Sequence, residues 1–145
     1  MSGTLQVLSP REASIFACFA DAVVAPEPPL PPVRETDTVA YIDRWMAASP
    51  RINAIGLRVL LHAIELAPLA SHHARLRQLD RDRRADWVKR VQGIPNPHVR
   101  LVWKLVKGAA QMAYYGDRGV MRTIGYDAEA NLARGRDLRV REGRP

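Results

Sequence analysis

Four histidines and one cysteine are the side chains of this sequence that most often bind metals or act as nucleophiles. A carboxylate-bridged metal site in a helical bundle requires Glu-x-x-His on two helices, because residues three positions apart share a helix face. The sequence has only the reverse order, His62-x-x-Glu65, and the adjacent pair His72-His73 would point its two rings in different directions on a helix. We therefore expect no metal site.

Nucleophilic and phosphate-binding motifs are also missing. Cys18 follows Phe16 and precedes Phe19 in an apolar stretch, where a thiol is usually a small core residue, and no basic neighbour in the sequence would lower its pKa. The sequence contains no G-x-S-x-G elbow, no G-x-G-x-x-G turn and no P-loop. We expect no catalytic residue and no bound cofactor in this chain, which would then not be an enzyme by itself.

The positive charge lies in the second half of the chain. The net charge is +7, and residues 80–145 supply all of it, with 15 basic and 8 acidic residues. This asymmetry is typical of a solvated arginine-rich surface, an acidic partner or a nucleic-acid surface. In residues 80–91, however, Asp82 and Asp86 alternate with the basic side chains, as in a salt-bridged surface helix. A basic helical nucleic-acid-binding domain stays as the alternative function.

Helical periodicity runs through most of the 145 residues. Ser9, Pro10 and Glu12 predict a capped first helix that stops before Pro26, and residues 26–36 predict a proline-rich connector. Further helices are predicted over residues 37–48, 50–67 and 80–91, with a short piece over 71–79 and one or two turns over 117–123. The apolar side chains predicted to be buried on the helices at 37–48 and 50–67 are Val39, Ile42, Trp45, Met46, Ile52, Ile55, Val59, Leu60, Ala63, Ile64 and Leu66.

A predicted helix that is apolar over most of its circumference covers residues 96–116, with Asn96 as its cap. Leu101, Leu105 and Met112 widen its apolar stripe until only a narrow polar edge is left, and such a helix belongs inside a domain. We therefore predict an all-α fold, a compact bundle of about five to six helices around residues 96–116. Residues 1–133 would form this single domain, and residues 134–145 an arginine-rich tail that is disordered or orders on a partner.

Membrane and export signals are not expected. No apolar run has the length of a membrane span, and the N-terminal residues lack the basic and apolar regions of a signal peptide. The sequence therefore favours a cytoplasmic chain, periplasmic only if a partner carries it.

Acidic Asp21 is unusual in its position, near a helix C-terminus and between apolar neighbours, where it opposes the helix dipole. Two interpretations stay open: an exposed acid at a helix edge, or a buried structural acid paired with an arginine or tyrosine.

A cluster of tyrosines is the best candidate for a protein interface. Tyr114 and Tyr115 cannot both face one interior, because adjacent helical residues point about 100° apart. Together with Asp117 and Tyr126 they form the predicted interface, since tyrosine is a favoured hot-spot residue. Alternatively, one of the tyrosines simply reaches a backbone carbonyl at the edge of the domain.

Two stretches resemble the gluconate 2-dehydrogenase subunit 3 family. LSPREASIFACFADAVVAP, residues 8–26, is similar to its first helix, and YYGDRGVMRTIGYD, residues 114–127, is similar to its C-terminal signature, although Arg118 stands where a proline is common. The resemblance implies a small helical subunit without its own cofactor. It would bind, stabilise or mature a larger FAD-dependent dehydrogenase of the glucose-methanol-choline type, which oxidises sugars or other alcohols and holds the FAD.

Overall fold

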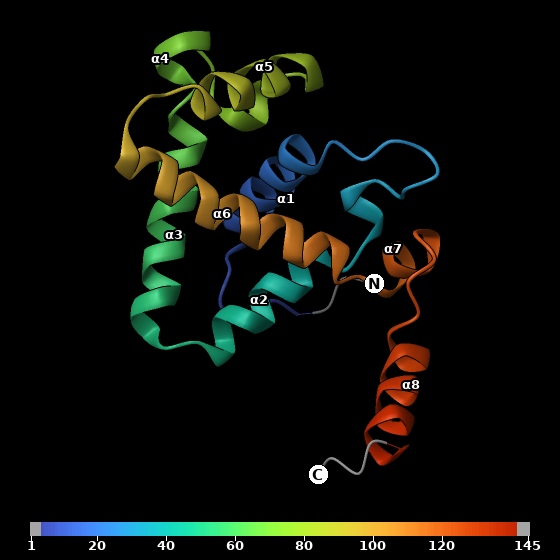
Figure 1. Ribbon diagram of the computed structural model, residues 1–145. Helices are drawn as coiled ribbons and strands as arrows, with labels where there is room; N and C mark the ends of the chain where they lie inside the picture. Colours follow the sequence, from blue (N-terminus) through green and yellow to red (C-terminus); the bar gives the residue numbers. More distant parts are fainter. Residues whose placement is uncertain (1–3, 142–145) are drawn as a thin grey trace.

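The computed structural model describes residues 4–141, and within them the chain is helical and contains no strand (Figure 1). This confirms the predicted all-α class. The helices are α1 (Pro10–Val24), α2 (Thr38–Ala48), α3 (Arg51–Leu66), α4 (Leu69–His72), α5 (Arg81–Gln92), α6 (Pro97–Tyr115), α7 (Arg118–Thr123) and α8 (Ala128–Arg141), with short 3-10 helices η1 (Val33–Glu35) and η2 (Leu76–Gln78).

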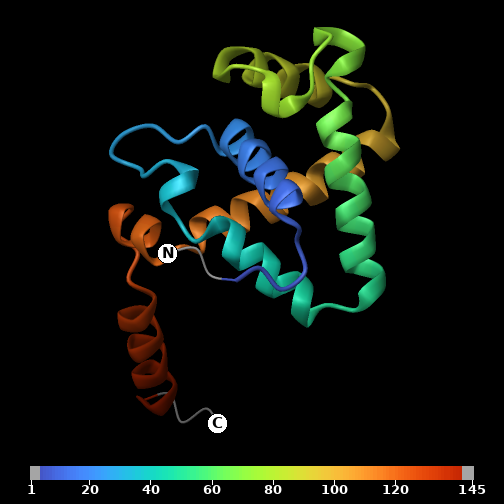
Figure 2. The ribbon, with the colours of Figure 1, turned by 180° about the vertical axis from the view of Figure 1, so that it is seen from behind.

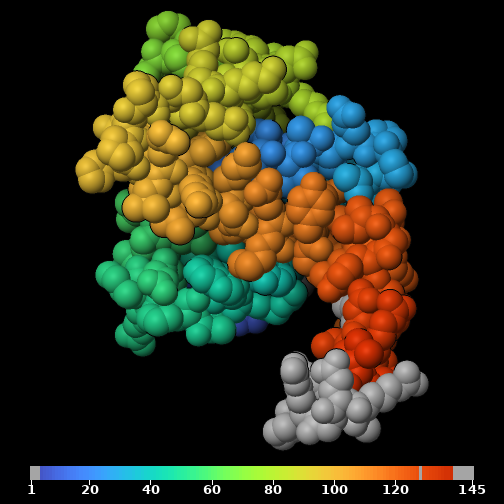
Figure 3. All heavy atoms as spheres, in the orientation of Figure 1, coloured from blue at the N-terminus to red at the C-terminus, as the bar shows by residue number. Residues whose placement is uncertain are grey.

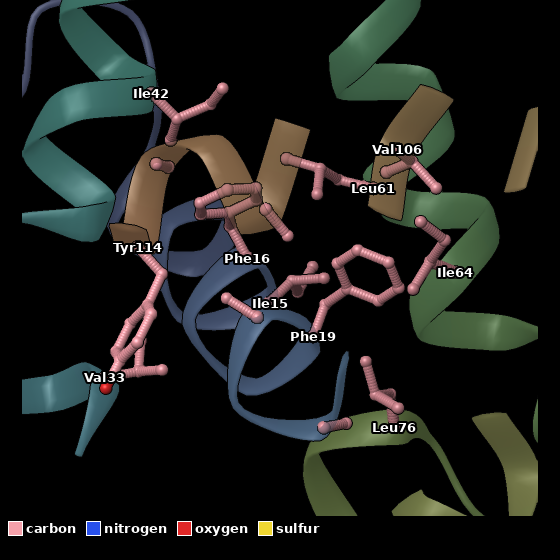
Figure 4. Close-up of a cluster of buried hydrophobic side chains, with 14 of the residues drawn as sticks. Ile15, Phe16, Phe19, Val33, Ile42, Leu61, Ile64, Leu76, Val106 and Tyr114 are labelled. Atoms are coloured by element: carbon pink, nitrogen blue, oxygen red, sulfur yellow. The ribbon is translucent and has the colours of Figure 1, made fainter. Parts of the chain in front are cut away.

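Helix α1 is the element around which the others pack. It contacts α2, α3, α5, α6 and both 3-10 helices, and Figure 4 shows its side chains Ile15, Phe16 and Phe19 at the centre of the core. All three are fully buried. The predicted capping box is confirmed, because the Ser9 hydroxyl accepts the backbone N–H of Glu12 while the Glu12 carboxylate accepts that of Ser9.

Helix α6 crosses the middle of the bundle on α1, and Figure 2 shows the two helices from the opposite side. It buries one face, formed by Trp103, Val106, Ala110, Ala113 and Tyr114. The expectation that the apolar residues around most of its circumference are buried is wrong: Leu101, Leu105 and Met112 are exposed, Leu105 at 65%. The other helices cover only one side of α6.

Helix α3 also differs from the sequence-based expectation. It packs on the core through Leu61 and Ile64, whereas most of the predicted buried stripe lies on the opposite side, in solvent. Trp45 on α2 is likewise exposed. Both sides of α3 are apolar, so helical periodicity alone could not tell which side faces the core. The exposed side chains of the predicted stripe are Ile52, Ile55, Val59, Ala63 and Leu66.

The segment Arg51–His72, which contains α3 and α4, is long and apolar enough to cross a membrane by length and composition alone. The expectation that no apolar run reaches that length therefore does not hold here. Only 22% of the most apolar window is buried in the bundle. A helix with apolar side chains on two opposite sides is usually buried on both, whereas α3 is covered on one side only.

The connector and the chain end complete the fold. Residues 26–36, the predicted connector, contain η1, and its Val33 is buried in the core. Helix α7 is followed by Gly125, whose φ of 74° is the left-handed conformation expected of a glycine that ends a helix. The predicted tail beginning at residue 134 is partly wrong, because α8 continues as a helix through Arg141 and leaves the bundle (Figure 1). Residues 142–145 of that prediction lie outside the described residues.

Candidate protein-docking face

The structure brings together few groups that could do chemistry. Among residues 4–141, no three histidine, cysteine or acidic side chains lie close enough to hold a metal ion. Cys18 is half-buried on α1, and burial raises the pKa of its thiol, although nearby Arg84 opposes the shift. A thiol with a raised pKa is a poor nucleophile near neutral pH.

The predicted tyrosine interface is split by the structure. Tyr114 is fully buried, and its hydroxyl donates a 2.6 Å hydrogen bond to the carbonyl of Pro31 in the connector. Its assignment as an interface residue is therefore wrong, and the alternative of a tyrosine that reaches a backbone carbonyl is correct. Tyr115 is 40% exposed and packs edge-on against the Tyr114 ring, with ring centroids 5.2 Å apart. The two tyrosines face different surroundings, as expected.

Asp117 has a structural role at the junction of α2 and α7. Its carboxylate accepts the backbone N–H groups of Gly119 and Val120, which caps α7, and also that of Asp37 at the start of α2. Burial alone would raise the pKa of Asp117, but these hydrogen bonds lower it below its ordinary value. Because both carboxylate oxygens already accept hydrogen bonds inside the fold, Asp117 is poorly available for hydrogen bonds to a partner protein.

Tyr126 is exposed and lines an open pocket of about 480 Å³ between α7 and the start of α8. Arg118 and Arg122 line the same pocket, and so do Asp127 and Glu129, so its charges are mixed. Such a pocket does not select an anion or a cation.

Asp21 falls between the two interpretations of the sequence. Its carboxylate lies 3.8 Å from the guanidinium of Arg84, so it does pair with an arginine, yet its side chain is 29% exposed. At this distance and exposure the ion pair contributes little to stability.

The three acids that are fully buried, Glu12, Asp43 and Glu65, were not predicted as such. Asp43 accepts the backbone N–H groups of three consecutive residues, 6–8, and so fastens the N-terminal segment to α2. Glu65 on α3 accepts a 3.0 Å hydrogen bond from the guanidinium of Arg77. The partners of both acids are distant in sequence and carry no local motif, whereas the capping-box pattern did single out Glu12.

Glu12 joins α1 to α3 through the guanidinium of Arg58, 2.8 Å away, and the ring of His62, 3.3 Å away. Burial raises the pKa of Glu12, but hydrogen bonds from Arg58 and Ser9 outweigh it and lower the pKa to about 2 from an ordinary 4.5. A lowered folded-state pKa stabilises the protein above pH 4.5, and this stabilisation is lost as the pH falls toward 2.

We expect Glu12→Gln to reduce the acid sensitivity of the fold. Between pH 5 and pH 3 the wild-type chain should lose more unfolding free energy than the variant, with a difference of about 1–2 kcal/mol over that range. Urea unfolding followed by circular dichroism at the two pH values measures it. Glu27→Gln, at an exposed acid, should behave like the wild type. An equal loss in wild type and Glu12→Gln would contradict the assignment.

The outer side of α3 has no partner among the residues that the structure describes. Ile52, Ile55, Val59 and Leu66 recur there at spacings of three, four and seven, and Val59 is 64% exposed. This spacing places them in one line along the helix. A surface of this kind on a folded domain usually marks an interaction site.

A groove continues this surface from α3 to α6. It has a volume of about 400 Å³, and its lining is almost entirely apolar. Val102 of α6 is exposed and lines the groove, and the exposed Leu105 follows it about one turn later on the same helix. We call the outer side of α3, the groove and the exposed apolar side of α6 the docking face. The residues lining the groove are Leu60, Ala63, Ile64, Ala67, Trp87, Val91, Ile94, His98, Val99, Val102, Trp103 and Val106.

The arginines around α5, by contrast, are largely engaged within the chain. Arg81 donates to the carbonyl of Pro26, Arg83 to that of His72 and Arg84 to that of Leu79. Arg90 pairs with Asp86 on the same helix. Side chains held in this way are less available to neutralise phosphates, which is what nucleic-acid binding depends on. This weighs against the nucleic-acid alternative.

Comparisons with known proteins add no relative. No protein-family model, curated protein or solved structure matches the chain. The similarity of residues 8–26 and 114–127 to the gluconate 2-dehydrogenase subunit 3 family therefore stays a prediction.

Proposed function

We propose that this chain is a non-catalytic accessory subunit that binds a larger protein through the docking face. The observation that carries the proposal is the line of exposed apolar side chains on α3, together with the apolar groove beside it. Burying such side chains gains about 25 cal/mol for each Å² of apolar surface removed from water. The described residues that could have suggested catalysis, Cys18 and the buried acids, serve packing and hydrogen bonding instead.

The sequence resemblance suggests which larger protein this is: an FAD-dependent sugar or alcohol dehydrogenase of the glucose-methanol-choline type. In this proposal the FAD belongs to the large subunit, and the small helical subunit stabilises or matures it. The structure shifts the proposed contact surface from the tyrosine cluster to α3 and α6, because Tyr114 and Asp117 are engaged inside the fold.

Co-expression with an FAD-dependent dehydrogenase of the glucose-methanol-choline type from the same organism, followed by affinity capture, tests the proposal. We expect the two chains to co-purify, and Val59→Glu to lower the captured dehydrogenase about tenfold or more, because a charge would enter an apolar contact. Val59→Ile is the matched control and should capture as the wild type does. Both Val59 variants should keep the wild-type melting temperature, since the side chain is exposed.

The proposal fails if the chain is recovered alone as a monomer while the dehydrogenase is soluble and active without it. It also fails if Val59→Glu captures as much dehydrogenase as the wild type, because the contact would then lie elsewhere.

A further inference from the structure

The charges around the docking face indicate the chemistry of its occupant. Helix α6 carries Arg100, Lys104 and Lys107 and no acidic residue. Helix α3 carries Arg51 and Arg58, of which Arg58 is already paired with the buried Glu12, and its one acid, Glu65, is buried and paired with Arg77. No carboxylate lines the groove, which is formed by α3 and α6 together with Trp87 and Val91 of α5 and with Ile94. The apolar surface is thus bordered by basic side chains and is free of exposed acids on α3 and α6. On α5 the exposed acids Asp82 and Asp86 do not line the groove, and Asp86 is paired with Arg90.

The basic residues lie along the two outer borders of the docking face. On α3, Arg51 and Arg58 follow the helix on one side of the line formed by Ile55 and Val59, and the groove lies on the other side. On α6, Arg100 and Lys104 lie beyond Leu101 and Leu105, again on the side away from the groove. In Figure 3, α6 lies on the face turned to the reader, above α2 and α3.

We propose that the docking face binds an amphipathic helix of the partner whose apolar ridge enters the groove and whose flanks carry acidic side chains. An apolar ridge matches a concave apolar groove between two helices, which is a common way of recognising a helical segment. Acidic flanks would meet the basic borders on both sides, and this complementarity mainly sets specificity and the rate of association. The inference rests on the proposed function and specifies the partner segment that this face recognises.

Two occupants from this chain itself fit less well. A second copy would place the basic borders of one docking face against those of the other, and like charges in contact oppose association. Helix α8 carries Arg134 and Arg136 against the single acid Asp137 in its exposed middle part, and it leaves the bundle at the other end of α6 (Figure 1). An anionic membrane surface also attracts basic and apolar side chains, but a concave groove suits a ridge better than a flat surface.

The test uses two fluorescein-labelled helical peptides of about 21 residues, with leucine at the core positions of each heptad. One has glutamate at the flanking positions and the other has lysine. Fluorescence anisotropy, at peptide concentrations where each peptide is monomeric, measures binding to the full chain. We expect the acidic peptide to bind at least about tenfold more tightly than its basic twin, and Val59→Glu to abolish this binding.

Charge reversal at the border supplies the second part of the test. Arg100→Glu with Lys104→Glu should weaken binding of the acidic peptide about tenfold or more, and the preference between the two peptides should narrow or reverse. Arg134→Glu with Arg136→Glu on α8 changes the net charge by the same amount and should leave binding unchanged. Circular dichroism verifies that each variant keeps its helical content.

Several outcomes overturn the inference. Equal affinity for the two peptides, or no binding of either, shows that acidic flanks are not what this face selects. Binding to phosphatidylcholine–phosphatidylglycerol vesicles that Val59→Glu abolishes assigns the face to a membrane. A dimer at low micromolar concentration in sedimentation, abolished by Val59→Glu, assigns it to a second copy.

The peptide test is independent of the dehydrogenase. If Val59→Glu prevents co-purification of the dehydrogenase but the acidic peptide is not preferred, the proposed function holds and the inference of an acidic partner helix is wrong. If the acidic peptide is preferred but no dehydrogenase is captured, the docking face binds an acidic amphipathic helix of a different partner.

Discussion

Phe19→Ala should destabilise the chain by about 3–5 kcal/mol, the usual range for removing a buried aromatic ring. Phe19 is fully buried on α1 and packs edge-on against Trp103 of α6, with ring centroids 5.6 Å apart. The substitution removes the ring that joins the two helices and leaves a cavity that the surrounding helices can only partly fill. Urea unfolding followed by the fluorescence of the three tryptophans measures the change.

Leu105→Ala is the control for Phe19→Ala, because it removes an apolar side chain that is exposed rather than buried. Leu105 belongs to α6, which packs on α1 through its other side, and its side chain is 65% exposed. We expect a change within about 0.5 kcal/mol of the wild type, as for most surface substitutions. A loss comparable to that of Phe19→Ala would mean that the outer side of α6 is covered in the isolated chain, which would contradict the docking face as well as the central place of α1.

Asp43→Asn should cost about 2–4 kcal/mol, because several charge-assisted hydrogen bonds are changed together. The buried carboxylate accepts the backbone N–H groups of Gln6, Val7 and Leu8 at 2.7–3.0 Å. An asparagine keeps the shape but has one acceptor oxygen, and its amide would point N–H groups at backbone N–H groups. We expect faster hydrogen exchange at residues 6–8, together with a lower urea midpoint.

Asp21→Asn is the matched control for Asp43→Asn, since it makes the same chemical change on another helix. The Asp21 carboxylate is partly exposed and 3.8 Å from Arg84, so its loss should cost less than about 1 kcal/mol. The interpretation of Asp21 as a buried acid would have required a loss of about 3–5 kcal/mol. Equal losses for the two variants would show that Asp43 does not fasten the N-terminal segment.

Asp43→Asn should also change the response of the fold to acid. Burial raises the pKa of Asp43, but the three backbone N–H groups lower it below the ordinary 3.8. The stabilisation is therefore present above pH 4 and is lost as the pH falls through the lowered pKa. The difference in unfolding free energy between wild type and Asp43→Asn should shrink below pH 4.

The sequence predicted α1, α2, α3, α5, α6 and α7 and several helix ends from local chemistry, but it did not predict α8 as a helix. The capping box at Ser9 and Glu12, the cap at Asn96 and the turn before Gly125 depend on neighbouring residues alone, and all are present in the structure. The opposite environments of Tyr114 and Tyr115 also followed from helix geometry. These features depend on residues within about one helical turn of each other, where the spacing in the sequence determines which side chains can be in contact.

Features that depend on distant packing could not be predicted in this way. Helices α3 and α6 are each apolar on two sides, so periodicity could not decide which side the core covers. The partners of Asp43 lie 35–37 positions away in the sequence, and Pro31 lies 83 positions from Tyr114. The apolar stripe at Ile52, Ile55 and Val59 predicts a buried face by its spacing, yet these side chains are exposed and form part of the docking face.

The central position of α1 also has a consequence for how the chain is made. Ribosomes synthesise the N-terminal end first, so α1 emerges early, while its main cover, α6, begins only at residue 97. Until α6 has been made, the aromatic side chains of Phe16 and Phe19 are only partly buried and can contact water and other nascent chains. Helix α1 is thus synthesised before the other helices described here and is among the last of them to be fully enclosed.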